Sequence, residues 1–164
     1  MLVIVFGLPG TGKSYFSEHL SVALQLEHIS SDQVRERMGL KGHYNPAFKE
    51  KVYHKMFELA QHAFARGRSV LLDATFSEAD WLNQARELAS QHGQKFKVVE
   101  MVASEEVIRE RVSKTRKHSE ADVEVYDKLK KSYQQFEDER LRLDSSGNEI
   151  SPLIEKAIEY LEDD

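Results

Sequence analysis

Gly7-Leu8-Pro9-Gly10-Thr11-Gly12-Lys13-Ser14 matches the phosphate-binding pattern G-x-x-x-x-G-K-[ST] at every fixed position. The apolar run 2–6 precedes it, and residues 12–26, which have apolar positions at helical spacing, follow it. This is the strand–loop–helix context that the pattern requires. A glycine-rich turn that only joins a strand to a helix is the alternative, but four fixed positions match by chance in roughly one chain of this length in a hundred. We therefore expect a loop that binds the phosphates of a nucleoside triphosphate.

The residue types in this loop suit a triphosphate and a metal ion. Glycines let the backbone turn with its amide groups pointing inward, which forms a nest for an anion, and the first turn of the following helix adds unpaired N–H groups. Lys13 can bridge the outer phosphates, and the Ser14 hydroxyl can bind Mg²⁺. We expect ATP and Mg²⁺ as ligands, and the sequence leaves open a preference for ATP or GTP. The residues expected to contact the nucleotide are Gly7, Leu8, Pro9, Gly10, Thr11, Gly12, Lys13, Ser14 and Tyr15.

Beyond the loop, apolar runs of strand length alternate with longer stretches of helical period, which is typical of an α/β fold with a parallel sheet. The expected strands are 2–6, 28–30, 69–72, 95–102 and 141–143. The expected helices are 12–26, 32–38, 47–66, 78–92, 105–116, 122–137 and 152–161. Five strands interleaved with helices predict a three-layer α/β/α sandwich, which we expect to form one domain over residues 1–164.

The composition excludes several classes of protein. Forty per cent hydrophobic and 31% charged residues are typical of a soluble globular chain. The net charge of −5 argues against a protein that binds duplex nucleic acid through a basic surface. The absence of cysteine excludes disulfides, a cysteine nucleophile and thiolate metal sites. The opening apolar run is too short to span a membrane and lacks the layout of a signal peptide, so we expect a cytoplasmic protein without membrane contact.

Asp32 and Arg35 follow the second expected strand and are the candidates for binding an acceptor. In doubly wound sheets, ligands lie beyond the carboxyl ends of the strands, so this turn should face the phosphate loop. Asp32 is suited to accept a proton from an attacking hydroxyl, and Arg35, one helical turn later, can hold an anionic group. Alternatively, Asp32 only caps the helix and Arg35 is solvated. A base for a hydroxyl favours phosphoryl transfer over ATP hydrolysis.

Val70-Leu-Leu-Asp73-Ala-Thr75 is an apolar strand that ends in an acid at the same edge of the sheet. Asp73 could act through Mg²⁺ and its waters, or it could orient the acceptor together with Thr75. The sequence does not separate these roles, and a carboxylate that merely ends a strand is the simpler alternative.

Positive charge is concentrated between Arg109 and His118, where five lysines and arginines stand against one acid. Such charge suits a transferring phosphoryl group, and a guanidinium binds two oxygens at once. We expect a lid over about 109–122, with Arg111 and Arg116 as the catalytic candidates. A solvated helix face is the alternative, because acids and bases also pair there at helical spacing.

Two further segments carry weaker signals. His43 and Tyr44, in the loop after Asp32, could touch an acceptor, but a surface loop is the favoured interpretation. The segment 143–148 follows the last expected strand, where a purine could lie.

The phosphate loop, Asp32-x-x-Arg35, the Leu-Leu-Asp73-Ala-Thr75 strand end and the Arg-rich stretch before Ser119-Glu-Ala-Asp122 together resemble the P-loop kinases of the AAA_33 type. The 5′-hydroxyl polynucleotide kinases are nearest in pattern, and chloramphenicol phosphotransferase and zeta-toxin-like kinases share the layout more loosely. The resemblance spans nearly the whole chain. It implies a parallel sheet in the order 2-3-1-4-5, ATP with Mg²⁺, and a lid over the phosphates.

The resemblance also implies roles for single residues. In polynucleotide kinases, the residue that matches Asp32 is the general base, the one that matches Arg35 holds the acceptor's phosphate, and a lid arginine contacts the donor phosphates. The strand end here reads Asp73-Ala-Thr-Phe76, where those kinases tend to have Asp-Thr-Asn.

The expected activity is that of an ATP-dependent kinase with an alcohol group as acceptor, most like a polynucleotide 5′-hydroxyl kinase. Two alternatives stay open. One is a kinase for a small molecule, such as a metabolite, an antibiotic or a nucleotide. The other is a nucleotide-binding switch that hydrolyses ATP only slowly.

Overall fold

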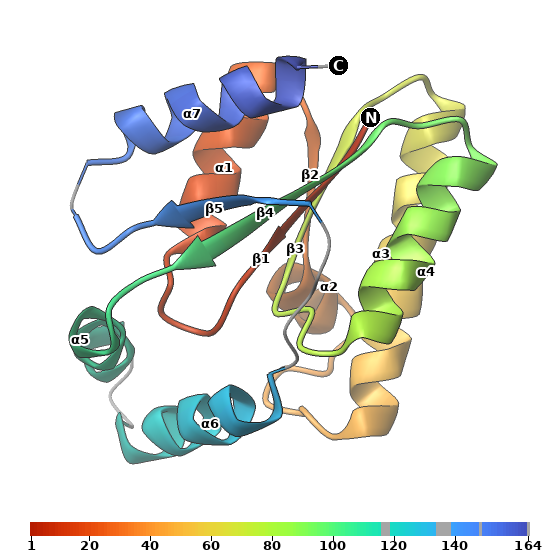
Figure 1. Cartoon of the computed structure of the whole chain (residues 1–164). Coiled ribbons are helices and arrows are strands. Elements are labelled where there is room, and N and C mark those ends of the chain that lie inside the picture. Colours follow the sequence, from red (N-terminus) through yellow and green to blue (C-terminus); the bar gives the residue numbers. More distant parts are fainter. Residues whose placement is uncertain (116–118, 134–138, 148, 164) are drawn as a thin grey trace.

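A computed structural model of the chain shows a parallel five-stranded sheet between helices (Figure 1). The structure describes residues 1–115, 119–133, 139–147 and 149–163. The strands are β1 (Leu2–Phe6), β2 (Glu27–Ser30), β3 (Val70–Ala74), β4 (Phe96–Val102) and β5 (Leu141–Asp144). They pair in the order β2-β3-β1-β4-β5, each with its neighbour in parallel register. The sheet order implied by the family resemblance is confirmed.

Helices cover both faces of the sheet and its carboxyl edge (Figure 1). The described helices are α1 (Lys13–Leu24), α2 (Ser31–Arg37), α3 (Pro46–Ala65), α4 (Ala79–Gln91), α5 (Glu105–Thr115), α6 (Ser119–Ser132) and α7 (Ser151–Glu162). The core of one face includes side chains of α1 and α7, and that of the other includes side chains of α2, α3 and α4. Helices α5 and α6 lie together beyond the carboxyl ends of the strands (Figure 1). The predicted three-layer α/β/α architecture is confirmed.

The burial of the central strand β1 explains why the carboxyl edge of the sheet can hold a site in a fixed position. All five of its residues are fully buried. Leu2, Ile4 and Phe6 pack into the core under α3 and α4, and Val3 and Val5 pack into the core under α1 and α7. A strand buried on both faces reads as a continuous apolar run, and this run leads directly into the phosphate loop.

Three predicted elements have an end that differs from the structure by two residues or more. Helix α1 stops at Leu24, because Gln25 adopts the left-handed conformation (φ 54°) and the N–H of Leu26 donates to the Ser21 carbonyl. Strand β3 continues through Asp73, since that residue pairs in register with Val5 of β1.

The third difference concerns the expected helix 122–137. Helix α6 spans Ser119–Ser132, where Tyr126 packs against Ile108 and Val112 of α5. This tertiary contact, which sequence periodicity does not contain, fixes the position of α6. Residues 134–138 lie outside the described part of the chain.

Among the described residues, no helix combines the length and the apolar character that crossing a membrane requires.

Candidate active site

The phosphate loop joins β1 to α1 and curls over the carboxyl end of the sheet. The Thr11 side chain donates a hydrogen bond back to the Leu8 carbonyl at 2.8 Å, which closes the loop. Gly10 has a φ of +84°, and a Cβ built there would lie 2.9 Å from a methyl carbon of Val112. Only glycine therefore fits at this position without strain. Gly12 is the N-cap residue of α1 and gives no side-chain cap, so the first N–H groups of the helix are left for a ligand.

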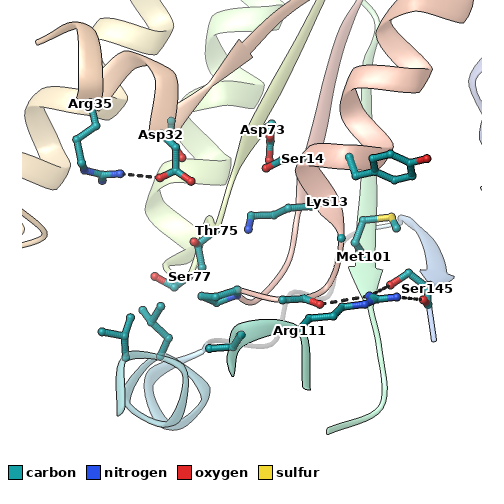
Figure 2. Close-up of a pocket in the computed structure, with 18 of the residues that line it drawn as sticks. Lys13, Ser14, Asp32, Arg35, Asp73, Thr75, Ser77, Met101, Arg111 and Ser145 are labelled. Carbon is teal, nitrogen blue, oxygen red and sulfur yellow. Dashed lines mark hydrogen bonds and ion pairs between the residues drawn. The ribbon is translucent and has the colours of Figure 1, made fainter. Parts of the chain in front are cut away.

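A cavity of about 860 Å³ opens beside this loop (Figure 2). Figure 2 shows Lys13 reaching into it from the phosphate loop, on the side where Asp32 and Thr75 lie. The predicted site residues that line the cavity are Pro9, Gly10, Gly12, Lys13, Ser14, Tyr15, Asp32, Arg35, Asp73, Thr75 and Arg111. Of the other predicted loop residues, Leu8 and Thr11 line a smaller cavity behind the loop, and Gly7 lines neither.

Asp32 and Arg35 lie together on one wall of the cavity, on the first two turns of α2. Their side chains form an ion pair, with Nη1 3.2 Å from Oδ1. The Asp32 side chain is 67% exposed, whereas that of Arg35 is only 9% exposed. Within the described part of the chain, Nη1 is the one guanidinium nitrogen of Arg35 that donates a hydrogen bond, and the buried Nε has no partner. A buried guanidinium with donors left over is suited to bind an anionic group.

The segment between α2 and α3 is a surface loop, as expected, with Tyr44 52% exposed, and it also contributes Tyr44 to this wall. The guanidinium of Arg35 lies 4.6 Å from the centroid of the Tyr44 ring, and Tyr44 also lines the cavity. A cation–π contact of this kind favours this position of the guanidinium group. His43 behaves as expected for a surface residue, with its ring against Phe48 and not in the cavity lining.

Asp73 is a buried carboxylate that the surrounding protein does not satisfy. It is 1% exposed, and among the described residues neither of its carboxylate oxygens has a hydrogen-bond partner. The imidazole of His28 on β2 lies beside it, with Nε2 3.4 Å from Oδ2. No motif singles out His28, because it is the parallel pairing of β2 with β3 that brings it beside Asp73.

Ser14 and Asp73 line the same cavity and offer the oxygen ligands that Mg²⁺ prefers. The unsatisfied carboxylate of Asp73 fits a hydrated cation, because the waters of the ion would supply its missing hydrogen bonds. Within the described ranges, no three His, Cys, Asp or Glu side chains cluster as a metal site. Mg²⁺ would therefore take most of its ligands from phosphates and waters, as is usual for this ion in nucleotide sites.

Arg111 of α5 lines the cavity but is held by the phosphate loop. Its Nη1 donates to the Ser145 hydroxyl at 2.9 Å and to the Gly10 carbonyl at 3.3 Å, and its Nη2 donates to the Ser145 carbonyl at 2.6 Å. The Ser145 hydroxyl in turn donates to the Thr11 carbonyl at 2.7 Å. Figure 2 shows Arg111 directed toward Ser145 and away from Asp32.

In this structure Arg111 thus links the loop after β5 to the phosphate loop. Its expected contact with a transferring phosphoryl group stays a prediction. Arg116, the other candidate, lies outside the described residues, as do residues 117 and 118 of the expected lid.

Residues 2–136 match the model of the AAA_33 family, which is described as an AAA domain. The chain belongs to this family. Comparison with curated proteins by sequence finds no match.

Three kinases are among the solved structures similar to this AAA_33 chain. The APS kinase CysC of Mycobacterium tuberculosis, in complex with AMPPNP and APS, has a TM-score of 0.82 at 20% identity, and the match covers 99% of this chain and 97% of that one. A gluconokinase from Sinorhizobium meliloti 1021 has a TM-score of 0.74 at 17% identity over 97% and 90% of the two chains. Shikimate kinase from Aquifex aeolicus vf5 has a TM-score of 0.63 at 16% identity over 99% and 96%. The predicted resemblance to P-loop kinases of the AAA_33 type is confirmed in family and fold.

The AAA_33 chain also places side chains in the cavity that the sequence did not single out. They come from α3, the turn after β3, α6 and the segment after β5, and include Lys49, Tyr53, Ser77, Val125, Lys128, Leu129 and Ser145, and the backbone of Gly147 lines the cavity as well. None of them belongs to a contiguous motif. Only the segment after β5 had been noted, as a place where a purine could lie, and that role stays a prediction.

Proposed function

We propose that this protein is an ATP-dependent kinase that transfers the γ-phosphoryl group to a hydroxyl group of a small molecule. One observation carries the proposal. A single cavity of about 860 Å³ holds the phosphate loop on one side and the Asp32–Arg35 pair on another. That volume suits a nucleotide and a small second substrate, because pockets for small ligands measure roughly 300–1,000 Å³.

The residues divide the chemistry between them. The loop amides and Lys13 bind the triphosphate, and Ser14, with Asp73 through water, would hold Mg²⁺. When bound, the ion neutralises charge on the phosphate oxygens. The acceptor oxygen forms a bond to the γ-phosphorus while the bond from that phosphorus to the β-γ bridging oxygen breaks, and ADP leaves. Asp32 takes the proton of the acceptor hydroxyl, and Arg35 orients the acceptor.

Two lines of support favour a small acceptor over the 5′ end of a nucleic acid, which was the leading expectation. The similar structures include kinases whose names refer to APS, gluconate and shikimate. The chain also has a net charge of −5, whereas proteins that bind nucleic acid depend on phosphate neutralisation by basic surfaces. The small-molecule alternative is therefore the better supported one. A switch that only hydrolyses ATP has no use for the donors that Arg35 leaves unpaired in the cavity.

The test is a transfer assay with γ-labelled ATP against small alcohols and against 5′-hydroxyl oligonucleotides, each at low and high salt. We expect label on a small alcohol with wild-type protein and a loss of roughly 10³-fold in Lys13→Ala, because the charge that stabilises the transferring group is gone. Label on oligonucleotides alone, with a steep salt dependence, would indicate a polynucleotide kinase. Hydrolysis with no acceptor at all would indicate the switch.

A further inference from the structure

A second cation besides Arg35 lies in the acceptor part of the cavity. Lys49, on the first turn of α3, lines the cavity and has a side chain that is only 20% exposed. Lys55, on the same helix outside the cavity lining, is 40% exposed and pairs with Glu58 at 2.7 Å. Lys49 is therefore the lysine of this pair that can meet a substrate.

The neighbours of the Lys49 ammonium group orient it but leave part of its hydrogen-bonding capacity unused. It donates to the Ser77 hydroxyl at 2.9 Å and forms an ion pair with Glu78, whose side chain is 52% exposed. An ammonium group has three donors, so one is left over among the described residues. The exposed Glu78 partner is held weakly, as ion pairs at the surface generally are, and an anion in the cavity can compete with it.

The wall beneath Lys49 is held by a ring contact and a buried hydrogen bond. The ammonium sits 5.9 Å from the centroid of the Tyr53 ring, and the Tyr53 hydroxyl accepts a hydrogen bond from the Phe76 N–H at 2.9 Å. Phe76 is fully buried and has a φ of +43°, a strained conformation for a bulky residue. This turn brings the residues on both sides of Phe76, Thr75 and Ser77, into the cavity lining.

Arg35 belongs to the same part of the cavity. Burial raises the pKa of Tyr53 above its ordinary value, and the charge of Arg35 acts on the same hydroxyl in the opposite direction. Figure 2 shows Ser77, to which Lys49 donates, on the same side of the cavity as Asp32 and Arg35, and both cations keep donors that the described protein does not use. Asp32, which accepts a hydrogen bond from Arg35, acts as the base in the proposed function.

We propose that the acceptor is an alcohol that carries an oxyanion group, either a carboxylate, a phosphate or a sulfate, and that Lys49 binds this group together with Arg35. Lys49 then selects charged alcohols over neutral ones. The inference rests on the proposed function, since it names the acceptor class of the same cavity.

The first test measures anion binding without any transfer. Protein saturated with Mg²⁺ and AMPPNP, so that the phosphate loop is occupied, is titrated with sulfate at constant ionic strength in calorimetry. Fluorescence gives a second readout, because the chain's one tryptophan, Trp81, stacks on Tyr53 with 4.7 Å between ring centroids. We expect saturable sulfate binding that Lys49→Met weakens about 10-fold.

Two further variants provide an independent test and a matched control. Glu78→Gln removes the competing charge and should tighten sulfate about 3-fold, which decides the matter even if Lys49→Met does not fold. Lys55→Met, the matched control, should bind within 2-fold of wild type. No saturable binding by either readout, or equal binding in wild type, Lys49→Met and Glu78→Gln, would overturn the inference.

The second test uses the transfer assay with alcohols in matched pairs, a hydroxy acid and its neutral amide. Wild type should prefer the acid at least 10-fold in kcat/KM, and Lys49→Met should lose most of that preference while the KM for ATP is unchanged. Equal use of both members would refute the inference and leave the kinase intact. Transfer to neither member, alongside sulfate binding that depends on Lys49, would refute the kinase and not the anion site.

Discussion

The nucleotide end and the acceptor end of the cavity are built in different ways. The nucleotide end is mainly backbone: eight consecutive residues, 7–14, form the loop, and Arg111 and Ser145 hold it through the carbonyl groups of Gly10 and Thr11. The acceptor end is made of side chains from α2, α3 and the turn after β3, with Asp32, Arg35 and Lys49 among them.

Because of this difference, the phosphate loop should tolerate few substitutions, whereas the residues at the acceptor end can vary. A loop that binds phosphates through amides depends on backbone geometry, so few substitutions are tolerated. A wall of side chains can be exchanged one residue at a time and so can adapt to another acceptor. Variants at the nucleotide end should therefore impair nucleotide binding, and variants at the acceptor end should impair use of the acceptor.

At the acceptor end, the largest effect should come from Asp32→Asn. The amide cannot take the proton of the acceptor hydroxyl, so we expect transfer to fall by roughly 10²–10³-fold. The Asp32 side chain is 67% exposed and belongs to the other end of the cavity, so nucleotide affinity should be unchanged. Glu36→Gln is the control, because among the described residues this exposed acid of the same helix pairs with Lys41 alone. A loss of nucleotide affinity in Asp32→Asn would return Asp32 to a structural role.

Gly10→Ala should disrupt the phosphate loop and so weaken nucleotide binding. Gly10 and Gly39 both have positive φ, +84° and +70°, but a Cβ at Gly10 meets Val112 and Ile108 within 3.0 Å, whereas one at Gly39 meets nothing within 4 Å. Both alanines should lower the free energy of unfolding by roughly 1–2 kcal/mol. Only Gly10→Ala should also weaken ATP binding, by at least about 10-fold as measured by calorimetry. Equal nucleotide affinity in the two variants would contradict the view that nucleotide binding depends on close packing of the phosphate loop at Gly10.

The same contrast explains what could be predicted from the sequence. The phosphate loop and the strand before it occupy one contiguous stretch, so a fixed spacing of residues encodes them. Asp32 and Arg35 could be paired because three positions on a helix bring side chains together, and the structure joins them at 3.2 Å. The architecture followed from the alternation of apolar runs and helical periods.

Contacts between distant segments were beyond the same reasoning. Lys49 meets Ser77, 28 positions away, and Arg111 meets Gly10, 101 positions away. No periodicity or motif encodes such pairs, because packing of α3 and α5 onto the sheet creates them. For the same reason, the contact of Tyr44 with Arg35 was not predicted. Arg35 lies on a separate helix.

Arg111→Met should have an intermediate effect, confined to the nucleotide end. The variant removes three hydrogen bonds from a charged group to the phosphate loop and Ser145. Hydrogen bonds of charged groups are worth about 1.5–3 kcal/mol each at most, and solvent will replace some of them. We expect the KM for ATP to rise about 10-fold with little change in the KM for the acceptor.

Arg109→Met is the matched control for this variant. Arg109 lies on the same helix, but it pairs with Glu105 and Asp127 and does not line the cavity. Steady-state kinetics of both variants decide the question. If Arg111→Met lowers kcat by orders of magnitude at saturating ATP, the arginine contacts the transferring phosphoryl group, as the sequence first indicated.

The smallest effect should come from Tyr53→Phe, which tests the rigidity of the acceptor wall. The phenylalanine ring can keep the stack on Trp81, but the buried N–H of Phe76 loses its acceptor in a turn that is already strained. An unpaired buried N–H costs about 1–3 kcal/mol, which corresponds to a decrease in Tm of roughly 2–10 °C for a chain of this length. Thr75 and Ser77 should become less ordered, so the KM for the acceptor should rise a few-fold while that for ATP stays constant. An unchanged Tm, or an equal rise in both KM values, would mean that the turn at Phe76 does not depend on Tyr53 and that the two ends of the cavity are less independent than their construction indicates.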